Sequence, residues 1–461
     1  MKKLIFCFSL FVPMVVLSQP SWFKSSPAEY VWMNVGDAGF SPGIIQYTRL
    51  AFSPSGSLYV AFSDGASDYK ATVMKFNGTT WENVGNAGFS SGRAEYLSLA
   101  FSPAGEPVVA FSDAGNSGKA AVMKFDGTVW VAVGTPGISA GRAEYTSLAY
   151  NPANGFPYIA FADKLNFYKC TIMQFDGTDW VNLGDPGIST GRAFFISLEF
   201  NPSHTPCVAY ADAGLSWRAS VMKYEENNWM SVGAQGFTLG NTSFNSFAFS
   251  PAGVPYIAFS DSLNGWKATV MYFDGSIWST LGPAGFSAGT IGFTSLTIGP
   301  AGVPYIVYED DMINLNKASV LKFDGTNWVY VGLGISEGTA NYTQIAFSPS
   351  GVPHVAFEDF TNAGKATVMK YDSVYTGVAE PWQQALSVYP NPASGLLTID
   401  CGTLSAGNNT LEITDINGVK IFGVEKPGKV IRLNVEDYAP GVYFVKLNTG
   451  NSGSVCKFCK F

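Results

Sequence analysis

The chain has 461 residues, more than one ordinary hydrophobic core needs, so we expect several domains or a repeat architecture. Charged residues make up only 13% of the sequence, whereas Gly (50), Phe (35) and Tyr (22) are abundant, which is typical of turn-rich β proteins and not of helical or disordered ones. The formal net charge is −8 and no basic run occurs, which argues against nucleic acid as a partner.

The N-terminus, MKKLIFCFSLFVPMVVLSQP, has the pattern of a secretory signal peptide. Two lysines precede an apolar run that is too short to span a membrane, and Val16 and Ser18 suit cleavage after Ser18. We therefore predict a signal peptide at 1–18 and a short linker at 19–27. No other segment is apolar enough to cross a bilayer, so we expect an exported, soluble mature chain without a transmembrane segment.

A repeat of about 49 residues follows. The tryptophans of the motif W-x-x-[VL]-G occur at positions 32, 81, 130, 180, 229, 278 and 328. The aspartates that close F-S-D or its variants, and the basic residues that open K-A-T-V-M or its variants, recur in the same register. Self-similarity at a fixed period indicates a fold in which each repeat is one supersecondary unit.

Each repeat has the pattern of four short strands, which in one unit lie at 96–103, 107–113, 119–125 and 130–134. Tight P-x-G and F-D-G-T turns separate the first pair and the last pair. The middle strands are apolar on both faces, so each small sheet must be covered on both sides. Seven such sheets predict an all-β fold, a seven-bladed β-propeller at 28–376.

The seventh repeat is incomplete, because it ends at Tyr371 without an outer strand and its tryptophan. The first tryptophan, Trp32, precedes the first complete repeat. We therefore predict that residues 29–36 are the outer strand of the last blade. This N-terminal strand would close the ring by pairing the two ends of the propeller, which removes two open sheet edges.

From about Leu386 the pattern changes to alternating apolar runs with Asn-Gly and Pro-Gly turns. This predicts a linker at 377–385 and a separate small C-terminal β-sandwich at 386–461. The segment resembles the C-terminal sorting domain (type A) of Bacteroidota type IX secretion cargo, on the motifs YPNPAS (389–394), DING (415–418) and APGVYFVKL (439–447) and a lysine-bearing end.

The resemblance implies export across the outer membrane by the type IX secretion machinery, which would engage residues 386–461. It also implies removal of this domain, followed by release or attachment at the cell surface. The propeller repeats are similar to repeats common in such exported proteins.

The five cysteines left after signal removal do not form the pattern of a disulfide framework. Cys170 and Cys207 replace Ala and, mostly, Tyr of other repeats, so we interpret them as core residues. The CKFC segment (456–459) has redox or metal spacing, but no histidine or second pair accompanies it, and Cys401 is an alternative partner for either cysteine. We expect no metal and no cofactor.

The repeated aspartates and basic residues flank the loop between the second and third strands. Sevenfold repetition supplies one group seven times, whereas a catalytic centre needs different groups, so we interpret the aspartates as loop caps. Binding on a rigid scaffold usually resides in variable residues of longer loops. The candidates are therefore the places where the repeats differ, at the end of the propeller that carries the interblade loops.

Two sets of loop residues stand out there. Arg93, Arg142 and Arg192 occupy one position in three consecutive repeats, and arginine suits recognition of carboxylate or sulfate. Glu95 and Glu144 lie two residues after the first two arginines, so simple charge neutralisation on a solvated surface is the alternative. Aromatic residues precede the basic residue in four loops, where exposed rings would be sugar platforms and buried rings would be padding: Tyr69, Tyr168, Trp217 and Trp266.

Signals for catalysis are weaker. Neither His204, in a tight turn, nor His354, on a strand, indicates a catalytic triad. Three extra acids in the last two full repeats, Glu309, Asp311 and Glu358, are candidates for a hydrolytic carboxylate pair. The sequence thus favours an exported module that binds glycan or a surface protein. A polysaccharide-degrading enzyme and a structural protein without a ligand are the alternatives.

Overall fold

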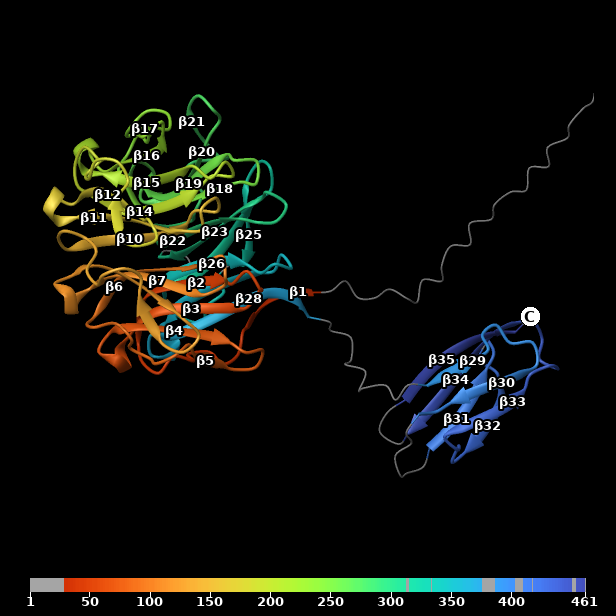
Figure 1. The fold of residues 1–461 in the computed structure, drawn as a ribbon. Coiled ribbons are helices and arrows are strands. Elements are labelled where there is room, and N and C mark those ends of the chain that lie inside the picture. The colour runs from red at the N-terminus through yellow and green to blue at the C-terminus, as the bar shows by residue number, and fades with distance from the viewer. Residues whose placement is uncertain are drawn as a thin grey trace, which may run out of the picture. The chain divides into compact units, whose positions relative to one another are not determined.

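The computed structural model describes residues 29–311, 315–332, 334–374, 386–402, 409–416, 418–449 and 453–460. The chain divides into a large compact unit, Tyr30–Asp372, and a small one that contains Ser373–Phe461 (Figure 1). The predicted signal peptide at 1–18 and the predicted linkers at 19–27 and 377–385 lie outside the described residues. No helix within the described ranges is long and apolar enough to cross a membrane.

The large unit consists of four-stranded antiparallel sheets, as the repeat predicts (Figure 1). In one repeat, β6 (Ala94–Phe101), β7 (Pro107–Asp113), β8 (Lys119–Phe125) and β9 (Trp130–Ala132) pair in chain order. The inner strand begins two residues earlier than predicted and the outer strand ends two residues earlier. The four-strand unit read from the sequence is confirmed.

Five further sheets repeat this order, and they comprise β2 (Ile45–Phe52), β3 (Leu58–Asp64), β4 (Lys70–Phe76) and β5 (Trp81–Asn83); β10 (Ala143–Tyr150), β11 (Pro157–Asp163), β12 (Lys169–Phe175) and β13 (Trp180–Asn182); β14 (Ala193–Phe200), β15 (Pro206–Asp212), β16 (Arg218–Glu225) and β17 (Asn228–Ser231); β18 (Thr242–Phe249), β19 (Pro255–Asp261), β20 (Lys267–Phe273) and β21 (Trp278–Thr280); and β22 (Ile291–Ile298), β23 (Pro304–Asp310), β24 (Lys317–Phe323) and β25 (Trp328–Gly332).

The last sheet contains both ends of the propeller. Its order is β1 (Glu29–Asn34), β28 (Lys365–Val374), β27 (Pro353–Asp359) and β26 (Ala340–Phe347), so the N-terminal strand supplies the missing outer strand (Figure 1). The first strands of neighbouring sheets contact one another in a closed cycle, β2–β6–β10–β14–β18–β22–β26–β2. The large unit is therefore a seven-bladed β-propeller closed by its N-terminal strand, as predicted.

The repeated tryptophans join neighbouring blades. The indole N–H of Trp130 donates to the Val84 carbonyl oxygen at 2.6 Å, and its ring stacks on Phe89 with centroids 4.0 Å apart. Trp32 on β1 makes the same type of bond to Val331 of the sixth blade, at 3.3 Å. The other five indoles donate equivalently, at 2.7–2.9 Å, to the carbonyl oxygens of Val35, Val133, Leu183, Val232 and Leu281.

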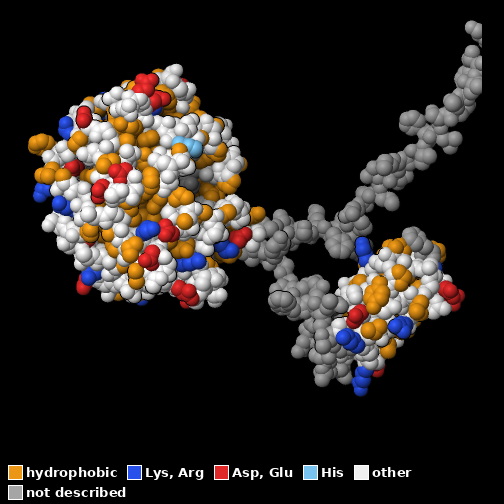
Figure 2. Space-filling model, viewed as in Figure 1, with side chains coloured by type: hydrophobic (Ala, Val, Ile, Leu, Met, Phe, Trp, Pro, Cys, Tyr) orange, Lys and Arg blue, Asp and Glu red, His pale blue; other side chains and the backbone are white. Residues whose placement is uncertain are grey.

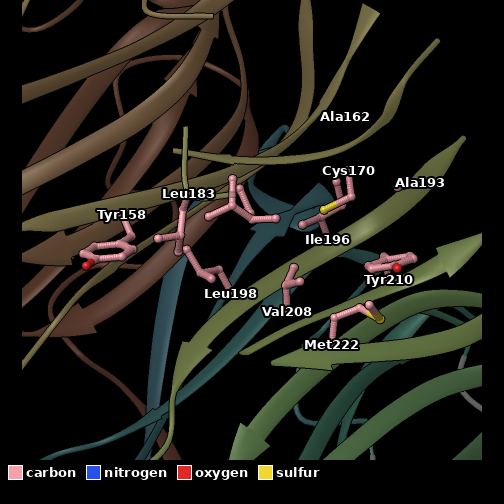
Figure 3. Packing of buried hydrophobic residues seen from close by; sticks show 12 residues of the cluster. Tyr158, Ala162, Cys170, Leu183, Ala193, Ile196, Leu198, Val208, Tyr210 and Met222 are labelled. Atoms are coloured by element: carbon pink, nitrogen blue, oxygen red, sulfur yellow. The ribbon is translucent and has the colours of Figure 1, made fainter. Parts of the chain in front are cut away.

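Apolar side chains fill the space between blades. Figure 3 shows one such cluster between the third and fourth blades, to which Cys170 of β12 belongs together with Leu183, Val208 and Tyr210. Cys170 is fully buried and burial raises the pKa of its thiol, which agrees with the interpretation of this cysteine as a core residue. Cys207 is likewise buried, in the cluster between the fourth and fifth blades.

The repeated aspartates cap the loops that follow the second strands. The Asp113 carboxylate accepts the backbone N–H groups of Gly115 at 3.0 Å and of Gly92 at 2.9 Å, and Asp113 pairs with Lys119 across the strands. Equivalent aspartates cap the other five 3-10 turns, so the interpretation as loop caps is confirmed for six of the seven repeated aspartates. These turns are η1 (Gly65–Ser67), η2 (Ala114–Asn116), η3 (Lys164–Asn166), η4 (Ala213–Leu215), η5 (Ser262–Asn264) and η6 (Phe360–Asn362).

The small unit is the predicted β-sandwich. One sheet has the order β29 (Ser387–Tyr389), β30 (Leu396–Asp400) and β33 (Val430–Asn434); the other has β32 (Lys420–Glu425), β31 (Asn409–Thr414), β34 (Gly441–Thr449) and β35 (Gly453–Lys460). Leu397 and Ile399 of the first sheet share one core with Ile413 and Val445 of the second. The five cysteines of the described residues are free, and Cys401 lies in this core.

Trp130 allows the interblade packing to be tested. Trp130→Ala removes a buried ring and leaves the Val84 carbonyl oxygen without its donor, so we expect a loss of about 3–5 kcal/mol in the free energy of unfolding of the propeller. Urea unfolding measures this loss. The matched control is Val129→Ala, at a neighbouring side chain that is 48% exposed, which should change stability by less than about 0.5 kcal/mol. A loss below about 1 kcal/mol for Trp130→Ala would contradict a role of Trp130 in the packing between blades.

Candidate binding site

The interblade loops meet the loops that the repeated aspartates cap at one end of the propeller. The Ala94 backbone N–H donates to the Tyr69 carbonyl oxygen of the preceding blade, and the Ala114 N–H donates to the Arg93 carbonyl oxygen, both at 2.9 Å. These bonds hold each interblade loop against two neighbouring loops. We call this end of the propeller the loop end. Its candidate side chains are therefore presented by a fixed backbone.

The three candidate arginines and the two glutamates beside them form one ladder across neighbouring blades. Arg142 contacts both glutamates, with 2.7 Å from Nη2 to Oε2 of Glu95 and 3.5 Å from Nε to Oε1 of Glu144. Arg93 lies 3.4 Å from Glu95, and Arg192 lies 2.6 Å from Glu144. The structure thus brings these five residues together, but their charges are largely directed at one another.

Two of the ladder arginines also cover two of the candidate aromatic rings. The guanidinium carbon of Arg93 lies 4.7 Å from the centre of the Tyr69 ring. That of Arg192 lies 4.3 Å from the centre of Tyr168 and 4.8 Å from that of Phe194. In each pair the arginine belongs to the blade after the tyrosine. These faces of Tyr69 and Tyr168 are therefore already occupied by cations.

The other two candidate aromatics are open. The positions equivalent to the arginines hold Asn241 and Thr290 in the next two blades, and none of the cation–π contacts among the described residues involves Trp217 or Trp266. Trp217 is 47% exposed and Trp266 is 41% exposed. Both line a cavity of about 470 Å³ at the loop end, together with Tyr145, Phe194, Phe195, Asn241, Thr242 and Ser243. We call this cavity the tryptophan pocket.

The backbone at these four aromatic positions favours glycine. Tyr69, Tyr168, Trp217 and Trp266 have φ between 54° and 61°, in the left-handed region that costs a bulky residue about 1–2 kcal/mol. The equivalent position of the second blade is occupied by Gly118, with φ of 72°. Since glycine meets this backbone requirement, folding does not explain the large rings.

A second aromatic feature surrounds the propeller axis. Seven rings, one per inner strand, form a closed collar with neighbouring centroids 4.6–5.3 Å apart: Tyr47, Tyr96, Tyr145, Phe195, Phe244, Phe293 and Tyr342. Each ring belongs to a residue with φ of 46–55° at a register shift between the first two strands. The collar lines part of an axial cavity of about 650 Å³.

Sequence reasoning missed the collar. The available signal was a Tyr or Phe at the third position of the inner strand in all seven repeats. In an inner strand that is otherwise apolar, such a residue resembles ordinary core. Only the bulge and its positive φ distinguish it.

The candidate catalytic acids belong to two neighbouring blades. Burial, and then the charge of Asp311, raise the pKa of Glu309 to about 7. Burial also raises the pKa of Glu358 to about 7, and the charge of Glu309 adds to this effect, against a lowering hydrogen bond with Asn341. Carboxyl groups with such pKa values can donate a proton near neutral pH. Within the described ranges, neither glutamate forms an ion pair with lysine or arginine.

Within the described residues, neither the histidines nor any group of metal-ligating side chains forms a second candidate site. His354 is buried and packs edge-on against Phe52, and burial lowers the pKa of its imidazole. His204 has a φ of 63° in the turn between β14 and β15. In the part of the chain that the structure describes, no group of three or more His, Cys, Asp or Glu side chains could hold a metal ion.

The small unit has a counterpart among known families. Residues 387–460 match the model of the secretion system C-terminal sorting domain. The small unit is a sorting domain of secreted proteins. The chain is therefore a type IX secretion cargo, exported to the cell surface or beyond it, as the sequence motifs imply. No curated protein matches the chain by sequence.

The chain is also similar to several solved structures. PorZ of Porphyromonas gingivalis, a surface component of the type IX secretion system, aligns at 13% identity and a TM-score of 0.46, over 90% of this chain and 59% of PorZ. The extracellular domain of BT4673 from B. thetaiotaomicron aligns at 9% identity and 0.49, over 94% of this chain and 59% of that one. The SapL1 lectin in complex with alpha methyl fucoside aligns at 13% and 0.44, over 66% and 99%.

This chain thus spans 59% of the length of PorZ and of the BT4673 domain. At these TM-scores the similarities carry no argument about function. The propeller assignment rests on the strand pairing described above, and the export of the chain rests on its sorting domain.

Glu358 gives the propeller a predicted pH dependence. Its folded pKa, about 7, lies above the ordinary value of 4.5, so its contribution to stability is fully present below about pH 4.5 and is lost as the pH rises through 7. Glu358→Gln should therefore raise the free energy of unfolding at pH 8 by about 1–3 kcal/mol and reduce the loss of stability between pH 5 and 8. Urea unfolding at both pH values measures this effect, with Glu337→Gln at an exposed position as the control. Equal pH dependence in wild type and Glu358→Gln would refute it.

Proposed function

We propose that the propeller is an exported carbohydrate-binding module whose site is the tryptophan pocket. The observation that carries the proposal is that Trp217 and Trp266 stay open where the equivalent tyrosines are covered by arginine. The C–H face of a sugar ring can stack on an open indole. Asn241 and Ser243 in the same cavity offer hydrogen-bonding groups for sugar hydroxyls.

The volume and the lining of the tryptophan pocket support a glycan as the ligand over a second protein. Its volume of about 470 Å³ lies within the range typical of small-ligand sites, and its lining combines aromatic rings with a few polar groups. Charged side chains are sparse and interspersed with hydrophobic ones on the face of the large unit seen in Figure 2. Export places this surface outside the cell, where glycans are available as ligands.

The test is a glycan array with the full mature chain, followed by calorimetry on the best glycan. Trp217→Ala and Trp266→Ala should each weaken binding about tenfold or more, because each removes a central aromatic contact. Trp217→Phe should retain part of the affinity. Leu263→Ala, at another exposed apolar loop residue, is the matched control and should bind like wild type.

Each outcome of the array has a clear meaning. Failure to bind any glycan, or equal binding by wild type and both tryptophan variants, would contradict the proposal. Release of new reducing ends from a bound polysaccharide, abolished by Glu309→Gln and Glu358→Gln, would instead support the hydrolytic alternative. The raised pKa of both glutamates is the observation that keeps this alternative in the test.

A further inference from the structure

The axial cavity contains two charged side chains that break the sevenfold pattern. Arg49 on β2 occupies an inner-strand position where five blades have serine and the seventh has Gln344. Glu199 on β14 occupies the position two residues further along, where five blades have alanine and one has Thr297. Both line the cavity of about 650 Å³ beside the collar. This inference is independent of the tryptophan pocket.

The scaffold itself favours serine at the position of Arg49. Ser98 accepts the backbone N–H of Leu148 in the next blade at 3.0 Å. The same interblade bond recurs at the equivalent serines 147, 246 and 295, with lengths of 2.9, 2.9 and 3.3 Å. Arginine at position 49 cannot make this bond, because its side chain has no acceptor. The blade joint therefore does not explain why arginine stands there.

Arg49 has little compensation for its enclosure. Its Nη1 donates to the carbonyl oxygen of the neighbouring Thr48 at 2.9 Å. Among the described residues, no carboxylate lies within ion-pair distance of its guanidinium. Enclosure by the surrounding strands lowers the pKa of Arg49 to about 10. A partly buried charge without an ion-pair partner is costly, and most of the guanidinium donors are available to a ligand in the cavity.

Glu199 is a second charged side chain of the same cavity, with the opposite sign. Its side chain is exposed to the cavity, and the surrounding inner strands raise the pKa of its carboxyl to about 7. No ion pair or side-chain hydrogen bond of Glu199 occurs within the described ranges. Next to Arg49 in the ring of blades, Gln344 donates from Nε2 to the Thr343 carbonyl oxygen at 3.1 Å, and its amide oxygen is available.

We infer that the axial cavity binds a small organic carboxylate that also carries hydroxyl or ammonium groups. The guanidinium of Arg49 would hold the carboxylate in the bidentate geometry that this pair favours. Glu199 and the amide oxygen of Gln344 would accept hydrogen bonds from the hydroxyl or ammonium groups. A ligand of this kind would supply an ion-pair partner for Arg49 and hydrogen-bond donors for Glu199.

The test is calorimetry on the full mature chain with D-glucuronate, L-glutamate, acetate and D-glucose as probes. D-glucuronate or L-glutamate should bind at least about tenfold more tightly than acetate and D-glucose. Arg49→Ser should weaken that binding at least about tenfold, whereas Arg49→Lys should retain part of it. Glu199→Ala should weaken binding of the same acid but not of acetate. Arg49→Ser and Glu199→Ala each introduce the residue that most blades carry at that position.

Stability separates a ligand role from a structural role for Arg49. Arg49→Ser should not lower the melting temperature of the ligand-free protein, because serine can accept the interblade N–H bond. Arg218→Ser, at the exposed first position of β16, should leave binding unchanged, and so should Trp217→Ala, which reports on the tryptophan pocket. The inference is overturned if neither acid binds, if Arg49→Ser binds as well as wild type, or if Arg49→Ser clearly destabilises the ligand-free protein.

Discussion

The bond from each repeated indole to the carbonyl oxygen of the preceding blade is the contact on which the propeller depends. It occurs seven times, and Trp32 makes the seventh from a strand at the opposite end of the chain. Pairing of β1 with β28 removes the two open sheet edges that the ring would otherwise expose. The closed ring fixes the loops, so that an arginine of one blade reliably reaches a ring of the blade before it.

Function in this molecule is best sought where the repeats differ, because the shared residues are occupied by the scaffold. The capping aspartates, the tryptophans and four of the five inner-strand serines have partners within the propeller. At the loop end, the change from arginine to Asn241 converts a covered aromatic ring into an open one. In the axial cavity, Arg49 replaces a serine that the fold would use. In both places a contact that stabilises the other blades is absent, and a side chain that can bind a ligand is left available: an indole ring at the loop end and a guanidinium in the axial cavity.

The repeat period was sufficient to predict the seven blades and the closing N-terminal strand, and alternating apolar runs with turn residues were sufficient to predict the C-terminal sandwich. Both signals were sufficient because these features depend on spacing and turn residues that recur in the chain. The sequence could also nominate Trp217 and Trp266, but it could not separate them from Tyr69 and Tyr168. That distinction depends on which arginine lies over which ring across a blade boundary, and no local pattern encodes it.

The collar and the axial charges were missed for a related reason. The inner strands look like ordinary core strands in sequence, since alternating side chains point to neighbouring blades. A bulge turns Tyr47 and its equivalents toward one another at the axis, and the closure of the ring places Arg49 and Glu199 in the lining of one axial cavity. Each of these is a consequence of seven sheets meeting, which a single repeat does not show.

The most direct test of the account is to restore the missing arginine. Asn241→Arg should place a guanidinium over Trp217, as Arg192 lies over Tyr168, and should lower the affinity for the best glycan at least about tenfold without loss of stability. Thr339→Arg, at the equivalent position of the last blade, lies beside Asn316 instead of an aromatic ring and should bind like wild type. Wild-type glycan affinity in a folded Asn241→Arg variant would contradict the claim that the open tryptophans form the site.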